Sequence, residues 1–269
     1  VDHTHADSVL VLTNQTEGPN LIHKALGPGV AVLPYTMSGL PLAKAVATQY
    51  ENHRELEAIV IVNHGIFTFA EDAETSYERM INFVNRARAF IAHKIEGKPH
   101  ITPRADIQFV QEAESGVARF VQTMRGACAH RGSDGRLRRF IVEFRNTQDL
   151  LEASVSNIAQ TLCASGVLTP DHVIRTKNKI AYVDTLPKNN TDILKRINQV
   201  VEDFVKDYHR YFREQVRARG FDLQELDPYP RIFIVAGLGM FALGFSRKEA
   251  KVAADIAGKT ICAKIKANA

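Results

Sequence analysis

A ten-residue pattern occurs twice in this chain, and this repetition constrains the fold more than any other feature. Residues 61–70 read IVNHGIFTFA and residues 235–244 read VAGLGMFALG, so that Gly65 aligns with Gly239 at a constant offset of 174 residues. In both copies an apolar run ends in a tight glycine-containing turn, and a capped helix is predicted to follow. The repeat therefore predicts two related modules within the 269 residues.

Short apolar runs alternate with amphipathic segments along the whole sequence. The predicted strands are residues 1–12, which are mostly extended, 29–33, 140–144, 180–183 and 231–236, and residues 57–70 are predicted to contain a strand and the turn after it. The predicted helices are residues 40–50, 72–92, 104–125, 147–162, 191–219 and a last helix opened by a capping box at Ser246. Strands separated by helices of this length predict an α/β fold built in layers. A glycine-containing loop at 131–135 predicts the boundary between a first module, 1–130, and a second module, 131–269.

Composition excludes several classes of protein. The formal net charge is only +4, and the basic clusters are not interleaved with aromatic residues, so no nucleic-acid partner is expected. The longest apolar run, residues 232–245, contains three glycines and is shorter than the ~20 residues of a membrane span. Cys128, Cys163 and Cys262 are scattered, which predicts a reducing, cytoplasmic location without disulfides.

Three histidines stand at the ends of predicted strands in the first module. His3 and His5 alternate in the segment VDHTHAD, and His64 follows the apolar run IVIVN. Residues two apart share one face of a strand, so both imidazoles of the pair are expected to point the same way. Three imidazoles suit a catalytic zinc ion with an open fourth position. Asp2 and Asp7 flank the pair and are candidate acceptors for the imidazole N–H groups.

The same segments carry a resemblance to a known family. The runs DHTHAD (2–7), LPY (33–35) and VNHG (62–65), followed by an acidic helix start, resemble the class II aldolase/adducin family over residues 1–95. Residues 168–177 and 237–257 are similar to the middle of bifunctional rhamnulose-1-phosphate aldolase/short-chain dehydrogenase proteins. The resemblance implies a layered α/β/α class II aldolase-like fold with a second related α/β module.

The resemblance also implies a chemistry. His3, His5 and His64 would be ligands of a Zn²⁺ ion that acts as a Lewis acid on a ketose phosphate and stabilises the ene-diolate formed on carbon–carbon cleavage. The implied reaction splits a phosphorylated ketose, with rhamnulose 1-phosphate as the best single candidate, into dihydroxyacetone phosphate and an aldehyde. The family's catalytic glutamate and phosphate-binding loop precede the His-x-His strand. The first module is therefore expected to be N-terminally truncated, and its proton-transfer residues stay unassigned.

The second module is expected to keep the scaffold without the metal site, because Leu238 occupies the position aligned with His64. Its residues 237–242, GLGMFA, also fit the dinucleotide-binding pattern G-x-G-x-x-A, with Asp255 as the acid. In that pattern the acid ends a second strand, whereas Asp255 lies inside the predicted helix after Ser246. The repeat explains the glycines better, so zinc is the only cofactor expected.

Two other functions are compatible with the same residues. One is an adducin-like scaffold that does not catalyse a reaction, and the other is a sugar-phosphate epimerase that uses the same metal ligands. The intact histidine triad favours an enzyme for the first module, whereas Leu238 favours packing or dimerisation for the second. Because the family often builds its sites between subunits, the resemblance further implies a homo-oligomer.

Overall fold

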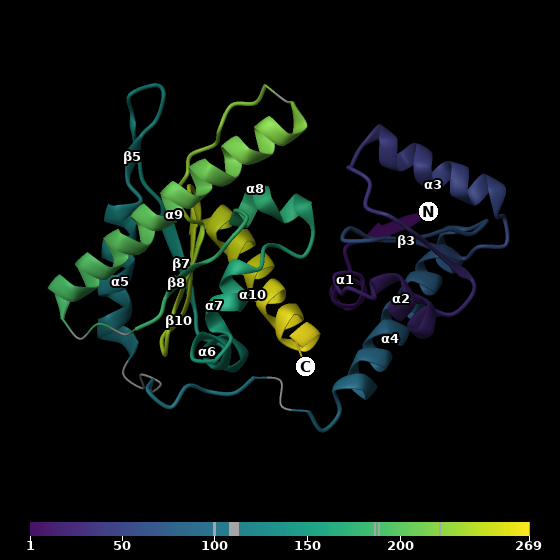
Figure 1. Ribbon diagram of the computed structural model, residues 1–269, viewed down its shortest axis with the longest axis horizontal. Helices are drawn as coiled ribbons and strands as arrows, with labels where there is room; N and C mark the ends of the chain where they lie inside the picture. Colours follow the sequence, from purple (N-terminus) through teal and green to yellow (C-terminus); the bar gives the residue numbers. More distant parts are fainter. Residues whose placement is uncertain (99–100, 108–112, 186, 188, 221, 269) are drawn as a thin grey trace. The chain divides into compact units, whose positions relative to one another are not determined.

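The chain divides into two compact units in the computed structural model, which describes residues 1–98, 101–107, 113–185, 187, 189–220 and 222–268 (Figure 1). Unit 1 consists of Val1–His100, Val167–Asp171 and Ala263–Ala269, and unit 2 consists of Ile101–Gly166 and His172–Cys262.

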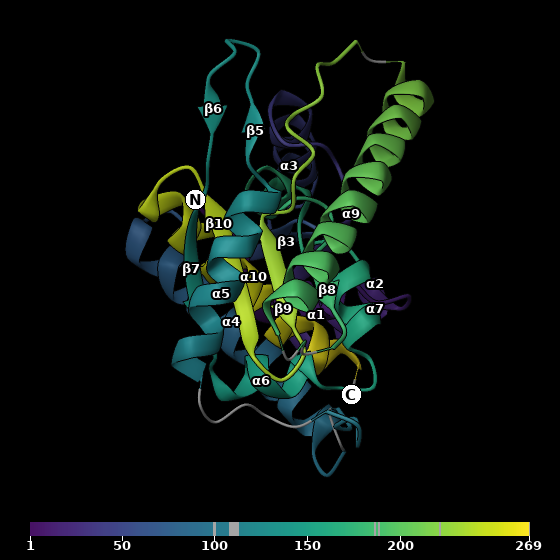
Figure 2. The same cartoon turned by 90° about the vertical axis from the view of Figure 1, so that its left-hand side faces the viewer.

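The division does not fall at the sequence-predicted boundary between residues 130 and 131. Strands β5 (His130–Arg131) and β6 (Leu137–Arg138) pair as an antiparallel hairpin inside unit 2, and Figure 2 shows this hairpin projecting past the sheet of that unit. The glycine-containing loop at 131–135 is thus part of a hairpin rather than a linker between the units.

Unit 1 is built around a four-stranded sheet in the order β1-β4-β3-β2. Its strands are β1 (Asp2–Thr4), β2 (Val30–Leu33), β3 (Ala58–Ile61) and β4 (Gly65–Thr68). Strands β2 and β3 are parallel, whereas β4 is antiparallel to both β3 and β1. Its helices are α1 (Asp7–Thr13), α2 (Gly18–Leu26), α3 (Leu40–Asn52) and α4 (Ala73–Ile95).

Helices cover both faces of this sheet (Figure 1). Helices α1, α2 and α4 pack on one face, where Leu10, Ile22 and Phe83 join a core with Val60 of β3. Helix α3 packs on the other face through Leu42. Alternate residues of β3 contribute to the two cores, as the side-chain alternation of a strand requires. The layered α/β/α fold predicted from the sequence is therefore confirmed.

The prediction of an extended segment over residues 1–12 was wrong beyond its first few residues. Only Asp2–Thr4 form a strand, and Asp7 opens helix α1. Residues 8–13 of this helix are all buried. A continuously apolar segment lacks the polar positions that would show helical periodicity, so it reads equally well as a buried strand.

Unit 2 contains a second four-stranded sheet in the order β7-β10-β9-β8. Its strands are β7 (Ile141–Arg145), β8 (Ala181–Val183), β9 (Ile232–Val235) and β10 (Gly239–Gly244). Its helices are α5 (Ala113–Ala127), α6 (Gln148–Ser154), α7 (Ala159–Ala164), α8 (Val173–Thr176), α9 (Asn190–Arg219) and α10 (Arg247–Asn268). The last residues of α10, from Ala263 on, belong to unit 1. A 3-10 turn, η1, spans Pro170–His172. Helices α5 and α9 lie on one face of the sheet and α10 lies on the other (Figure 1).

The two sheets have the same topology, which confirms the repeat. In each, a parallel pair is followed by two antiparallel neighbours, and the turn between the central strands has one residue with positive φ: Asn63 (φ 59°) or Gly237 (φ 76°). The register is also equivalent, with Ile61 opposite Gly65 in unit 1 and Val235 opposite Gly239 in unit 2. One element was not predicted from the sequence. In each unit an antiparallel strand, β4 in unit 1 and β10 in unit 2, lies between this turn and the following helix.

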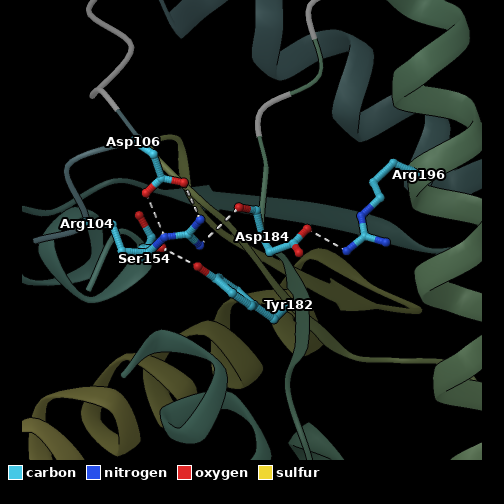
Figure 3. A network of polar contacts seen from close by, with 6 residues as sticks. All are labelled: Arg104, Asp106, Ser154, Tyr182, Asp184 and Arg196. Atoms are coloured by element: carbon cyan, nitrogen blue, oxygen red, sulfur yellow. Dashed lines mark hydrogen bonds and ion pairs between the residues drawn. The ribbon is translucent and has the colours of Figure 1, made fainter. Parts of the chain in front are cut away.

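A polar network connects Arg104 and Asp106, near the start of unit 2, to strand β8 of the unit 2 sheet (Figure 3). Arg104 pairs with Asp106 (Nη2 to Oδ2, 2.6 Å), and its guanidinium donates to the Asp184 carbonyl oxygen. Tyr182 of β8 is almost fully buried, and its hydroxyl donates to the carbonyl oxygen of Ser154 at 2.9 Å. Burial also raises the pKa of Tyr182. The network joins strand β8, the end of helix α6 and the segment that follows unit 1.

Among the described residues, no helix combines the length and the apolar character needed to cross a membrane.

Candidate metal centre

The three predicted ligands come from two adjacent parts of the unit 1 sheet. His3 lies in β1, His5 follows the end of that strand, and His64 lies in the turn between β3 and β4. Strand β1 pairs with β4, placing His3 opposite Phe67. Because β4 begins one residue after His64, this pairing brings the turn next to the His-x-His segment.

The three imidazoles converge as the sequence predicted. Each offers a nitrogen atom, and these atoms all lie within 4.8 Å of one another. The ring centroids are 5.0 Å apart for His3 and His5, 5.3 Å for His3 and His64, and 4.9 Å for His5 and His64. Nitrogen atoms that share one zinc ion lie about 3.3 Å apart, so small side-chain movements would allow all three to bind the same cation.

The orientation of His3 is fixed by contacts with strand β4. Its Nδ1 lies 3.0 Å from the carbonyl oxygen of Ile66, and its ring stacks on Phe67 at 3.9 Å between centroids. A ring nitrogen that donates to a carbonyl leaves the other nitrogen available as a metal ligand. Burial lowers the pKa of His3, which favours the neutral imidazole that a metal requires.

His64 is held in place by the turn itself. Its side chain is only 3% exposed, and its backbone N–H donates to the carbonyl oxygen of Ile61 at 3.1 Å. Asn63 beside it has a positive φ of 59°, a conformation that asparagine tolerates better than most residues. This turn directs a buried imidazole towards the end of β1.

Gly65 allows the close approach of the two segments. A Cβ atom at this position would lie 2.5 Å from the carbonyl oxygen of Thr4 and 3.1 Å from ring atoms of both His3 and His5. A side chain here would therefore occupy the space in which the imidazoles meet. The three nitrogen donors and this tight backbone contact together fit a site for one divalent cation.

Three polar residues near the histidines were not identified from the sequence. The ring of Tyr35, just after β2, has its centroid 6.5 Å from that of His64. Asp171 lies 3.7 Å from His5 (Oδ2 to Nε2) and accepts a hydrogen bond from the hydroxyl of Ser38. The position of Tyr35 could have been inferred from the sequence. Tyr35 follows β2 and His64 follows β3, and because these strands are parallel, both residues lie at the same edge of the sheet. The position of Asp171 could not, because more than a hundred residues separate it from His64.

The equivalent region of unit 2 has lost the histidines. The register places Phe144 opposite Phe241, as His3 stands opposite Phe67, and Leu238 takes the position of His64. Leu238 and Phe241 are buried in the core of unit 2, and Phe144 packs against them. Gly239 preserves the close approach, since a Cβ atom there would lie 2.6 Å from the carbonyl oxygen of Arg145. Unit 2 has kept the scaffold and replaced the ligands by apolar packing.

The glycines of residues 237–242 do not form a dinucleotide-binding turn. They join the antiparallel strands β9 and β10, whereas that motif needs a glycine turn leading directly into a helix. Asp255 lies within α10 and pairs with Arg145 at 2.6 Å (Oδ1 to Nη1). The repeat accounts for these glycines, as expected.

One cavity of unit 1, about 330 Å³ in volume, is separate from the histidine cluster. It lies among helices α1, α2 and α4 and the end of α10, and its lining includes Leu12, Phe90 and Lys266 but none of the three histidines. We place the chemistry at the imidazoles because the cavity wall is predominantly apolar and offers no comparable set of metal donors.

Comparisons with known proteins assign this architecture to a family. Residues 1–91 match the class II aldolase and adducin N-terminal domain, and residues 115–269 match the second domain of class II aldolases. The chain therefore belongs to the class II aldolase family.

Two individual proteins are similar to the chain. It is 26% identical over 269 residues to YuxG of Bacillus subtilis (strain 168), described as an uncharacterized oxidoreductase, and the match covers 97% of this chain but 37% of that protein. The chain thus spans little more than a third of that relative. The N-terminal class II aldolase domain of a conserved protein from Thermoplasma acidophilum is 40% identical, with a TM-score of 0.30 over 33% of this chain and 40% of that one.

Proposed function

We propose that the chain is the aldolase part of a zinc-dependent lyase that cleaves a phosphorylated ketose, such as rhamnulose 1-phosphate, into dihydroxyacetone phosphate and an aldehyde. The observation that carries the proposal is the convergence of His3, His5 and His64 within 4.8 Å. Family membership supports a carbon–carbon lyase, and the donor set supports zinc. The sugar substrate and the cytoplasmic location are part of the proposal.

The residues of the chain have distinct tasks in this proposal. His3, His5 and His64 would hold the cation, which would supply Lewis-acid stabilisation for negative charge that develops on the substrate oxygens. The contacts of His3 with Ile66 and Phe67 fix its ring before any ligand binds. The turn at Asn63 fixes His64. Such preorganisation lowers the cost of assembling the site.

Unit 2 has a different role in the proposal. Because Phe144 and Leu238 replace two of the ligands and are packed against or within its core, unit 2 would contribute to packing or to assembly of a homo-oligomer. An adducin-like scaffold and a sugar-phosphate epimerase remain the alternatives for the whole protein.

Product analysis of the full protein that contains this chain tests the proposal. We expect release of dihydroxyacetone phosphate from rhamnulose 1-phosphate, measured by coupled reduction, and loss of that release after chelation or in His64→Ala. Tyr182→Phe in unit 2 is the matched control and should retain activity. Conversion to an epimer without cleavage would identify an epimerase, and turnover of no sugar phosphate by a zinc-loaded protein would favour the scaffold.

A further inference from the structure

The segment of residues 167–171 reaches the histidine cluster from a distant part of the sequence. Leu168 is 5% exposed and packs in the core of unit 1, and its carbonyl oxygen accepts a hydrogen bond from the side chain of Asn14 at 2.8 Å. The next residue, Thr169, is fully buried. These contacts fix the backbone just before Asp171, so the carboxylate of Asp171 has a defined place in unit 1.

The carboxylate of Asp171 is oriented by its neighbours but keeps room for a further partner. Its Oδ1 accepts a hydrogen bond from the hydroxyl of Ser38 at 3.2 Å. Its Oδ2 lies 3.7 Å from His5 Nε2, which is too far for a good hydrogen bond. An ionised carboxylate can accept several hydrogen bonds and donates none. Because the side chain is 46% exposed, these acceptor positions are open to a molecule that approaches the histidines from solvent.

Asp171 lies beside the metal donors without being one of them. Among the described residues, the side chains whose donor atoms converge are His3, His5 and His64, and Asp171 does not belong to this group. Three protein ligands leave a catalytic zinc ion with an open position for water or substrate. A carboxylate next to this position, but outside the donor set, is placed to contact the substrate rather than the cation.

The proposed reaction leaves one substrate hydroxyl for such an acceptor. Negative charge develops on the oxygens of the dihydroxyacetone phosphate half, where the cation would stabilise it. The aldehyde half of rhamnulose 1-phosphate is lactaldehyde, which carries a hydroxyl on the carbon next to its carbonyl. This hydroxyl takes no part in the bond cleavage. A hydroxyl that donates to an ionised carboxylate forms one of the stronger hydrogen bonds in proteins.

We propose that Asp171 determines substrate specificity by accepting a hydrogen bond from the hydroxyl on the aldehyde half of the substrate. This inference rests on the proposed function, because it requires the ketose phosphate to bind at the histidine site. Ser38 is the positioning residue that holds the carboxylate for this contact. The substrates selected in this way are ketose phosphates whose aldehyde half carries a hydroxyl next to the reacting carbon.

Aldol addition, the reverse of the cleavage, tests the inference with two aldehydes. The full protein that contains this chain would join dihydroxyacetone phosphate to lactaldehyde or to propionaldehyde, which lacks the hydroxyl. Asp171→Ala should lower kcat/KM for lactaldehyde about tenfold or more and leave kcat/KM for propionaldehyde within about twofold of the wild type, because only lactaldehyde loses a hydrogen bond to a charged group. Ser38→Ala should lower kcat/KM for lactaldehyde by a smaller factor.

Two controls accompany these assays. Asp222→Ala, the same truncation at an exposed residue of unit 2, should match the wild type with both aldehydes. The zinc content of Asp171→Ala, measured by metal analysis, should equal that of the wild type, because the carboxylate does not hold the cation. Loss of zinc from Asp171→Ala would overturn the inference, since the carboxylate would then act on the metal site.

The remaining outcomes separate this inference from the proposed function. An equal loss of kcat/KM with both aldehydes would overturn the inference, because the carboxylate would then serve the reaction rather than the recognition of the hydroxyl. Unchanged kcat/KM with both aldehydes in Asp171→Ala would also overturn it and leave the proposed function intact. A wild-type protein that adds dihydroxyacetone phosphate to neither aldehyde would overturn both.

Discussion

Replacing Gly65 by alanine tests whether close packing of two backbone segments creates the site. The added Cβ would lie 2.5 Å from the Thr4 carbonyl oxygen, a contact that no side-chain rotation can relieve. Strand β1 would have to move by about half an ångström, and overpacking of this kind costs about 1–3 kcal/mol. Because metal–ligand distances tolerate only ~0.2 Å, zinc affinity should fall along with stability.

Gly29→Ala in the same unit is the matched control. The three atoms nearest to its Cβ would all belong to the Glu57 side chain, whose carboxylate oxygen lies 3.3 Å away and can move aside. We expect Gly65→Ala to lower the free energy of unfolding in urea by about 1–3 kcal/mol and to weaken zinc binding in a competition assay with a chromophoric chelator. The control should stay within about 0.5 kcal/mol of the wild type. Wild-type stability and zinc affinity in Gly65→Ala would refute the packing argument.

Three further predictions concern unit 2. Tyr182→Phe removes the buried hydrogen bond to Ser154 and should cost about 0.5–1.5 kcal/mol in urea denaturation, and an unchanged midpoint would contradict the role of the polar network. Burial lowers the pKa of Lys177 to about 8, so the folded state binds fewer protons than the unfolded state between that value and about 10.4. The free energy of unfolding of the wild type should therefore include a contribution that rises with pH across this window. The Lys177→Met variant should lack this contribution. The same pH dependence of stability in the wild type and in Lys177→Met would exclude the lowered pKa of Lys177. Burial raises the pKa of Cys128 to about 12, so mass spectrometry should find the partly exposed Cys262 alkylated first, and equal labelling rates would contradict this.

The sequence predicted the convergence of the three histidines because its determinants are local. His3 and His5 are separated by one residue, and His64 ends an apolar run followed by a glycine. Alternation along a strand and the turn at Gly65 are enough to direct these side chains towards a shared point. The Ser246 cap of the last helix was confirmed for the same reason, since its Oγ accepts from the N–H of Glu249 at 3.2 Å, although the Glu249 carboxylate accepts from the N–H of Phe245 rather than from that of Ser246.

The remaining features depend on contacts that a local pattern does not encode. Strands β4 and β10 were missed because both are almost continuously buried, and a turn before an apolar run can lead into a strand or a helix. Helix α5 was assigned to the first module, yet its Phe120 and Met124 pack in the core of unit 2. An apolar helix face does not specify which core it joins, and the position of Asp171 likewise depends on the folded chain.

Zinc K-edge X-ray absorption of the purified, zinc-loaded chain tests the central claim most directly. The account predicts one bound zinc per chain, with a shell of three imidazole nitrogens at about 2.0–2.1 Å, and loss of that shell in His64→Ala. A wild-type chain that retains no zinc, or a His64→Ala variant whose zinc content and imidazole shell equal those of the wild type, would contradict it.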